Sequence, residues 1–282
     1  MYKSKIYIFI IIAILLSSCT ENKNPDTKKK TISGNQIVKP ELQSMFDSLD
    51  VIGSVLIYDF QKDLYYSNNF KWAKKGKLPA STFKVVNSII ALESGVVKDD
   101  RSIFKWDGEK RWMKQWEQDL IFKDAFHLSC VPCFQDVARK IGAERMNNYL
   151  TKLDYGNMEV DSNNIDLFWL EGKSRINQFQ QIDFLKRFNN SKLPISRRTE
   201  EIMKRVMIIE ERENYRLSGK TGWSDSNGMD NGWFVGYLEL GPKSYIFATN
   251  VEPKQRFDMD KFSSVRKEIT FIAFKKLDIH YN

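Results

Sequence analysis

Ser81 and Lys84 are the residues whose types and spacing first suggest covalent chemistry. They lie in PASTFKVVNSIIALESG, residues 79–95, at the predicted start of an apolar helix. Residues three apart on a helix share a face, so the hydroxyl and the amine can meet. The unpaired N–H groups of a first helical turn would also stabilise an oxyanion that develops near Ser81. The pair therefore predicts a nucleophilic serine with lysine as its base.

The position predicted for Lys84 disfavours an ammonium group. Burial and the positive end of the helix dipole both lower the pKa of a lysine. A neutral amine could remove the proton of Ser81, or it could react with CO2 and become an anionic carbamate, which this position tolerates better. The alternative is that Ser81 caps the helix and Lys84 extends to solvent, because S-x-x-K also occurs by chance.

Other catalytic centres find little support in the sequence. The two histidines, His127 and His280, form no zinc-spaced cluster with cysteine, so no metal is expected. The G-x-S-x-G nucleophile elbow is absent, and Gly219-Lys220-Thr221 lacks the earlier glycine of a phosphate-binding loop. The net charge of +8 is spread along the chain, which argues against nucleic-acid binding and favours anionic small molecules or an anionic membrane surface.

Strands are predicted at both ends of the chain, with helices between them. Residues 100–212 are mostly helical and loop-rich, and they include a helix over 197–209 and another that is interrupted at Gly142. A short helix over 41–49 and an amphipathic helix over 262–280 lie near the two termini. The β-like stretches are residues 53–69, 214–224, 231–240 and 244–253. We therefore expect a mixed α/β fold, in which terminal helices flank one antiparallel sheet and an all-helical lobe is inserted.

The N-terminal stretch has the pattern of an export signal. Lys3 and Lys5 precede an apolar run over residues 6–16, which is shorter than the roughly 20 residues of a membrane-spanning helix. The sequence LSSC, which ends at Cys19, resembles a bacterial lipobox. That resemblance implies cleavage before Cys19 and a lipid on its sulfur. A plain signal peptide and an uncleaved anchor are the alternatives.

These features divide the chain into three predicted parts. A lipoprotein-type signal peptide covers residues 1–18, a lipidated tether covers 19–37, and a catalytic domain covers 38–282. We expect an exported, periplasmic protein that its lipid holds at a bacterial membrane. The sequence does not specify an oligomeric state.

Cys130 and Cys133 form a C-x-x-C pair. A thioredoxin-like redox site needs this motif in a βαβ setting, which the surrounding sequence does not provide. We expect a disulfide formed in an oxidising compartment, or two buried thiols.

A late strand supplies a partner for the serine–lysine pair. Lys220-Thr221-Gly222 lies in RLSGKTGW, and a K-T-G strand beside an S-x-x-K helix is the active-site pairing of penicillin-recognising serine enzymes. From about residue 38 to its end, the chain resembles the class D, or oxacillinase-type, β-lactamases. The matching stretches, in the family's order, are PASTFK, LSCVPCFQDVARKIG, LDYGN, FWLEG, SGKTGW, NGWFVGYLE and VRKEIT.

This resemblance implies catalytic roles for five residues. Ser81 would be the acylated nucleophile. Lys84, carboxylated by CO2 or bicarbonate, would be the general base for acylation and deacylation. Ser129 would relay a proton to the leaving lactam nitrogen, unless it only caps the next helix. Val131 would cover the lysine with an apolar side chain. Trp169 would donate its indole N–H to the carbamate, unless it is an ordinary core tryptophan.

The resemblance also implies a substrate-binding set. Lys220, Thr221 and Arg266 would hold the substrate carboxylate, and Gly222 completes the strand motif. The backbone N–H groups of Ser81 and Trp223 would form the oxyanion hole. The alternatives are that Lys220 and Thr221 are solvated strand residues, and that Lys267 takes the place of Arg266.

The expected function is hydrolysis of small-molecule β-lactam antibiotics without a bound cofactor. One alternative is a β-lactam-sensing domain that is acylated without turnover; the apolar Val131 argues against it, because such sensors usually carry a polar residue there. The other is a cell-wall transpeptidase or carboxypeptidase. All three would be acylated, so the rate of deacylation distinguishes them.

Overall fold

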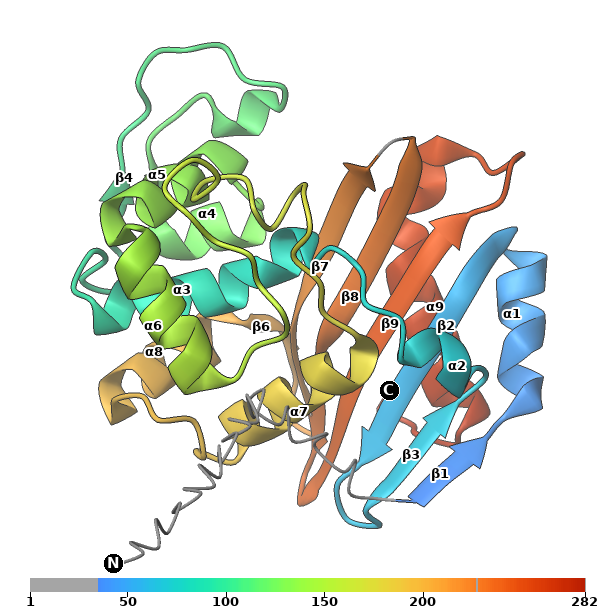
Figure 1. The fold of residues 1–282 in the computed structure, drawn as a ribbon. Helices are drawn as coiled ribbons and strands as arrows, with labels where there is room; N and C mark the ends of the chain where they lie inside the picture. Colours follow the sequence, from blue (N-terminus) through green and yellow to red (C-terminus); the bar gives the residue numbers. More distant parts are fainter. Residues whose placement is uncertain (1–34, 227, 282) are drawn as a thin grey trace, which may run out of the picture. The chain divides into compact units, whose positions relative to one another are not determined.

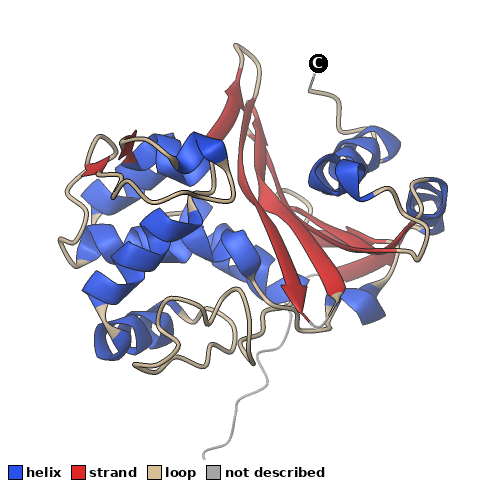
Figure 2. Cartoon of the chain, turned by 90° about the horizontal axis from the view of Figure 1, so that it is seen from above, coloured by secondary structure: helices blue, strands red, loops and turns tan. Residues whose placement is uncertain are grey.

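The computed structural model describes residues 35–226 and 228–281. The predicted signal peptide, Cys19 and most of the predicted tether lie outside these residues. These described residues form one compact unit, in which a seven-stranded sheet separates two groups of helices (Figures 1 and 2). In the part of the chain that the structure describes, no helix combines the length and the hydropathy needed to cross a membrane.

Early and late strands join in one sheet, as the sequence predicts. The order is β1-β3-β2-β9-β8-β7-β6, and every neighbouring pair is antiparallel except β1 with β3. The early and late strands meet where β2 pairs with β9. The strands are β1 (Asn35–Val38), β2 (Val51–Asp59), β3 (Leu64–Ser67), β6 (Ile208–Glu211), β7 (Arg216–Ser226), β8 (Met229–Leu240) and β9 (Lys243–Pro253).

The two edge strands of this sheet are not predicted from the sequence. β1 begins at Asn35, before the predicted start of the fold near Val38. The helix predicted over 197–209 is too long, because α8 (Arg197–Val206) ends first and β6 follows it. Ile208 continues the apolar spacing of the helix, yet it pairs with Ser218 of β7. The spacing of apolar residues does not show that a segment pairs through its backbone with the edge of a sheet.

Helices cover both faces of the sheet, which explains its apolar central strands. On one face, α1 (Gln43–Ser48) and α9 (Phe262–Lys276) pack against the sheet through residues such as Phe46, Phe247 and Phe274. On the other face lie α2 (Phe70–Ala73), α7 (Gln178–Asn189) and the helical lobe (Figure 2). Because both faces are covered, β2 is buried at every position except Ile52.

The helical lobe lies between the early and late strands of the sequence. Gly142 separates two of its helices at a φ of 79°, a conformation that glycine adopts without strain, so the predicted interruption is confirmed. Two short strands, β4 (Ile103–Phe104) and β5 (Leu120–Ile121), also pair within the lobe. Besides α8, its helices are α3 (Lys84–Glu93), α4 (Phe122–His127), α5 (Val131–Ile141) and α6 (Ala143–Leu153).

A close approach of two strands sets the position of Lys220. Gly219 of β7 and Gly236 of β8 lie opposite each other. A Cβ atom on Gly236 would lie 2.1 Å from the carbonyl oxygen of Ser218 and 2.8 Å from the Phe247 ring. Lys220 is the next residue after Gly219 on β7. The distance between β7 and β8 at this point therefore affects where the Lys220 side chain lies.

We expect Gly236→Ala to lower the free energy of unfolding by about 2 kcal/mol or more, because the strands must separate to admit a methyl group. Gly108→Ala is a suitable comparison: its added Cβ would meet nothing within 4 Å, and only its φ of 84° is unfavourable, at about 1 kcal/mol. Urea unfolding measures both values. Equal losses would mean that β7 and β8 have room for a side chain.

Candidate active site

Ser81 lies in a 3-10 turn, Ala80–Phe83, that leads into α3. Ala80 has a φ of 50°, in the left-handed region that few residues other than glycine adopt. Such a conformation persists only where the surrounding structure holds it, and here the Ala80 N–H donates to the carbonyl oxygen of Trp169 at 2.8 Å. The nucleophile position is therefore a constrained turn at the beginning of α3.

Lys84 is buried beside Ser81, as the spacing predicts. Its Nζ donates to Ser81 Oγ at 2.9 Å, and the residue is 1% exposed. The alternative of a lysine that extends to solvent is therefore wrong. The ring centroid of Phe134 lies 5.4 Å from Nζ. Burial lowers the pKa of Lys84 to about 7, so the neutral amine is readily available near neutral pH.

Trp169 lies against the same turn. Its ring stacks on Phe83, with centroids 5.4 Å apart, and the residue is 0% exposed. The indole N–H has no hydrogen-bond partner. An unpaired buried donor is unfavourable, so this nitrogen has the capacity to bind an acceptor that is added to the site.

Ser129 lies between α4 and α5 and contacts Lys220 of β7. Lys220 Nζ donates to Ser129 Oγ, and also to the carbonyl oxygen of Thr221 at 3.1 Å. Lys220 is 4% exposed, so it is not a solvated strand residue. The N-cap of α5 is Cys130, which accepts the N–H of Cys133. The alternative role of Ser129 as the helix cap is therefore wrong.

The edge of β7 beside Ser81 is free to pair with an extended ligand. Within the described residues, β6 pairs with β7 only as far as Ser218, and the Gly219 N–H donates to the carbonyl oxygen of Met207 at 2.9 Å. Beyond that point the turn that carries Ser81 approaches β7 (Figure 1). A Cβ atom on Gly222 would lie 3.1 Å from the backbone of both Pro79 and Thr82. Gly222 and the following Trp223 are thus held next to Ser81.

Arg266 of α9 reaches the same strand. Its Nη1 donates to the carbonyl oxygen of Gly222, and its guanidinium carbon lies 5.9 Å from the centroid of the Trp223 ring. Burial lowers the pKa of Arg266 to about 10. Arg266, and not Lys267, is therefore the residue that contacts β7. Lys267 lines the adjacent pocket. That pocket, of about 590 Å³, is bordered by Thr221, Ser263, Ser264, Arg266, Lys267, Glu268, Phe271 and Ile272.

Several cations share this small region. Burial, together with the charges of Lys84, Arg266 and Lys267, lowers the pKa of Lys220 well below its ordinary value. Burial and Arg266 likewise lower the pKa of Lys267. Like charges that repel one another favour a bound anion, so the site is suited to a ligand that carries a carboxylate.

Two polar side chains that sequence reasoning missed, Thr82 and Gln181, hold the Ser81 turn together with Tyr155 of the LDYGN stretch. Thr82 Oγ1 donates to the Pro79 carbonyl oxygen and accepts Gln181 Nε2 at 2.9 Å. Tyr155 OH in turn donates to Gln181 Oε1 at 3.4 Å. Phe134 was also missed, although it lies one helical turn after Val131, the first residue of α5. That spacing was an available signal, whereas the contact of Thr82 with Gln181, 99 residues away, had none.

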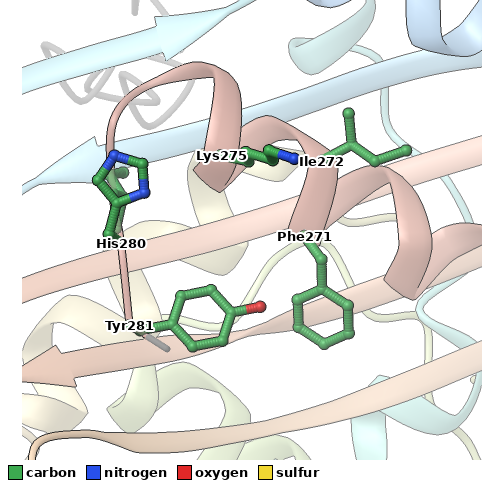
Figure 3. Close-up of a pocket in the computed structure, with 6 residues that line it drawn as sticks. Phe271, Ile272, Lys275, His280 and Tyr281 are labelled. Carbon is green, nitrogen blue, oxygen red and sulfur yellow. The ribbon is translucent and has the colours of Figure 1, made fainter.

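A second pocket lies at the C-terminal end of α9 and contains none of the predicted site residues (Figure 3). Its volume is about 520 Å³, and Phe271, Ile272, Lys275, Ile279, His280 and Tyr281 line it. Within residues 35–226 and 228–281, no group of three or more His, Cys, Asp or Glu side chains is placed to hold a metal ion.

Comparison with known proteins gives consistent matches. The model of the penicillin-binding protein transpeptidase domain matches residues 21–273. β-Lactamase OXA-48 of Klebsiella pneumoniae is 39% identical over 217 residues, which cover 77% of this chain and 82% of that protein. The crystal structure of the class D β-lactamase YbXI from Nostoc is 41% identical with a TM-score of 0.81, and the match covers 86% of this chain and 100% of that one.

A regulatory protein is among the more distant relatives. BlaR1 of Bacillus licheniformis is 29% identical over 257 residues, which cover 90% of this chain but 42% of that protein. The higher identities, and matches that cover most of the relative's own length, are with proteins named β-lactamases. The chain therefore belongs to the penicillin-binding protein transpeptidase family and, within it, to the class D β-lactamases, which are serine hydrolases that need no metal or cofactor.

Proposed function

We propose that this protein hydrolyses β-lactam antibiotics through an acyl-enzyme on Ser81. The observation that carries the proposal is the hydrogen bond of 2.9 Å between the buried amine of Lys84 and Ser81 Oγ. A lysine whose pKa is about 7 can be neutral at physiological pH, so a base lies within reach of the nucleophile's proton. The similarity to proteins named β-lactamases supports the substrate class.

In acylation, Ser81 Oγ forms a bond to the lactam carbonyl carbon while its proton passes to the base at Lys84. The backbone N–H groups of Ser81 and Trp223 stabilise the oxyanion. As the C–N bond of the ring breaks, Ser129 gives a proton to the leaving nitrogen and is resupplied through Lys220, with which it is hydrogen-bonded.

Substrate binding uses the free edge of β7 and the cations around it. An extended ligand can pair with the strand backbone beyond Gly219, whose N–H is the last on this edge to be bonded by the segment around β6. Thr221, Lys220 and Arg266 receive the substrate carboxylate, which offsets the repulsion among the cations.

We further propose that Lys84 is carboxylated by CO2. The neutral amine attacks CO2, a proton is lost, and the carbamate, when present, supplies an anionic base for deacylation. The unpaired N–H of Trp169 supports this assignment, because a carboxylate on the neighbouring turn would accept it. Burial disfavours the ammonium form of Lys84, and we propose that the apolar side chain of Val131 contributes to this desolvation.

The second candidate function is that of a β-lactam sensor, which the similarity to BlaR1 over most of this chain favours. A sensor would be acylated at Ser81 in the same way but would not release the product. Release requires a base that stays competent after acylation. The buried, neutral environment of Lys84 supports hydrolysis over sensing.

We also propose that the protein is exported and lipidated at Cys19, with residues 1–18 as the signal peptide and 19–37 as the tether. The support is the basic, apolar and LSSC order of the first residues. The catalytic domain, from about residue 38 to 282, would then act at the periplasmic side of a membrane.

The deciding measurement is steady-state hydrolysis of a chromogenic cephalosporin by residues 20–282 with bicarbonate present. Sustained turnover is expected, and Ser81→Ala should reduce it by at least about 1000-fold, because the covalent intermediate can no longer form. One stoichiometric burst that is followed by no further product would instead identify a sensor or a transpeptidase.

Activity without added bicarbonate should fall about tenfold between pH 8 and pH 6. Below a pKa of about 7 Lys84 is protonated and cannot react with CO2, whereas above it the neutral amine predominates. Stripping CO2 at pH 8 should remove most activity, and bicarbonate should restore it. Lys84→Ala should be inactive under all these conditions. Full activity of the CO2-free enzyme at pH 8 would show that the amine itself is the base.

Trp169→Phe should raise the bicarbonate concentration needed for half-maximal activity by about tenfold. The reason is that the carbamate would lose one hydrogen bond to its charged group, and such a bond contributes roughly that factor in affinity. Saturating bicarbonate should restore most of the rate. Trp106→Phe is the control, because the indole N–H of Trp106 donates to the Glu109 carbonyl oxygen at 2.8 Å, away from the site residues, and its loss should leave the bicarbonate requirement unchanged. An unchanged bicarbonate requirement in Trp169→Phe would argue against the contact with the carbamate.

A further inference from the structure

Cys130 and Cys133 form a disulfide in the structure, with Cα atoms 5.4 Å apart. This decides between the bridge and the two buried thiols that the sequence left open. Cys130 is 0% exposed. Cys133 is partly exposed, so a small thiol can approach the bridge from that side, whereas the buried Cys130 is not placed to attack another protein as the sulfur of a dithiol oxidoreductase would.

The bridge is also poorly placed to stabilise the fold as a whole. The two cysteines are only three positions apart in sequence. A bridge that closes so short a loop restrains the unfolded chain less than one that closes a long loop. Its consequence must therefore be sought in the local structure that it closes.

One side of the bridge adjoins Ser129. The φ of Ser129 is 53°, a left-handed conformation that is unfavourable for serine and needs support from its surroundings. The N–H of Ser129 donates to the Phe126 carbonyl oxygen at 3.2 Å, and the N–H of Cys130 donates to that of Ala125 at 2.9 Å. The disulfide fixes the side chain of the next residue, so the chain cannot relax out of this conformation on that side.

The other side of the bridge adjoins Phe134. The ring of Phe134 lies 5.4 Å from Lys84 Nζ, and its carbonyl oxygen accepts Asn87 Nδ2 at 3.1 Å. Its own N–H donates to the Cys130 carbonyl oxygen at 3.3 Å. The single turn from Ser129 to Phe134 therefore contacts Lys220 at one end and Lys84 at the other, and the disulfide lies between these contacts.

We propose that the Cys130–Cys133 disulfide is a positioning element of the active site: it holds Ser129 against Lys220 while Phe134 stays beside Lys84. Its kinetic consequence rests on the proposed β-lactamase function. Reduction by dithiothreitol, which gives two electrons and two protons to the S–S bond and becomes a cyclic disulfide, leaves two thiols. The turn then loses its covalent restraint, and acylation slows.

The test uses the full chain carrying Cys19→Ser, in which Cys130 and Cys133 are the only cysteines, because the sequence has three. Thiol titration of the unfolded protein should find no free thiol before reduction and two after it. The reduced protein should be acylated about tenfold more slowly in single-turnover measurements, since small misplacements of a proton donor are costly. The β-lactam concentration for half-maximal acylation should change less than twofold.

Cys130→Ser/Cys133→Ala is the matched variant. A serine at position 130 can still cap α5 by accepting the N–H of residue 133, as the Cys130 sulfur does, so only the covalent link is lost. We expect it to be slow both with and without dithiothreitol, at temperatures well below its melting temperature. A rate within twofold of the unreduced Cys19→Ser protein, in this variant or in the reduced protein, would overturn the proposal, as would two free thiols before reduction.

Amide hydrogen exchange separates this inference from the proposed function. The N–H groups of Ser129 and Cys130 should exchange several-fold faster after reduction. The N–H of Gly142, which donates to Ala138 at the far end of α5, should not change. If no β-lactam acylates Ser81 but exchange responds in this way, the proposed function fails and the restraint on the turn stands. Unchanged exchange at Ser129 and Cys130 overturns the inference whatever the activity.

Discussion

A lysine amine held out of water beside a serine hydroxyl is the interaction on which the rest of this structure depends. The amine of Lys84 donates to a neutral oxygen, Ser81 Oγ, which cannot balance a buried positive charge. The site can keep this lysine only by favouring its neutral form, and burial does so. The packing that buries Lys84 maintains that condition. The reactivity of Ser81 therefore depends on how well the helical lobe is packed.

The serine and its partners come from two parts of the fold, so the contact between these parts must be rigid. Ser81 and Ser129 belong to the helical lobe, whereas Lys220 and Trp223 belong to the sheet. The segment before Ser81 is fixed to the sheet through the carbonyl oxygen of Leu78, which accepts Asn231 Nδ2 at 2.9 Å as well as the Trp233 indole. β8 therefore sets the position of the nucleophile and, through its pairing with β7, that of Lys220.

The sequence predicts the features that depend on residues close to one another along the chain. The spacing of Ser81 and Lys84 and the apolar pattern of the β7–β9 region carry their own signals, and the layout of the sheet follows from the latter. The pairing of the two lysine motifs follows from the resemblance to penicillin-recognising serine enzymes. The sequence does not show which residue caps α5, because Ser129 and Cys130 are adjacent and both have polar side-chain atoms. It also cannot show that Gln181 holds Thr82, or that β1 pairs with β3, since these contacts depend on the assembled fold.

Charge connects the two lysines more closely than their separate roles suggest. Burial lowers the pKa of Lys220, and the positive charges of Arg266, Lys267 and the protonated form of Lys84 lower it further. A carboxyl group on Lys84 would place a negative charge there instead, and an opposite charge raises the pKa of a lysine. Lys220 would then hold its proton more firmly and remain the donor to Ser129. The modification that supplies the base on one side of the site would thus also keep the acid charged on the other, which links proton removal from Ser81 to proton delivery by Ser129.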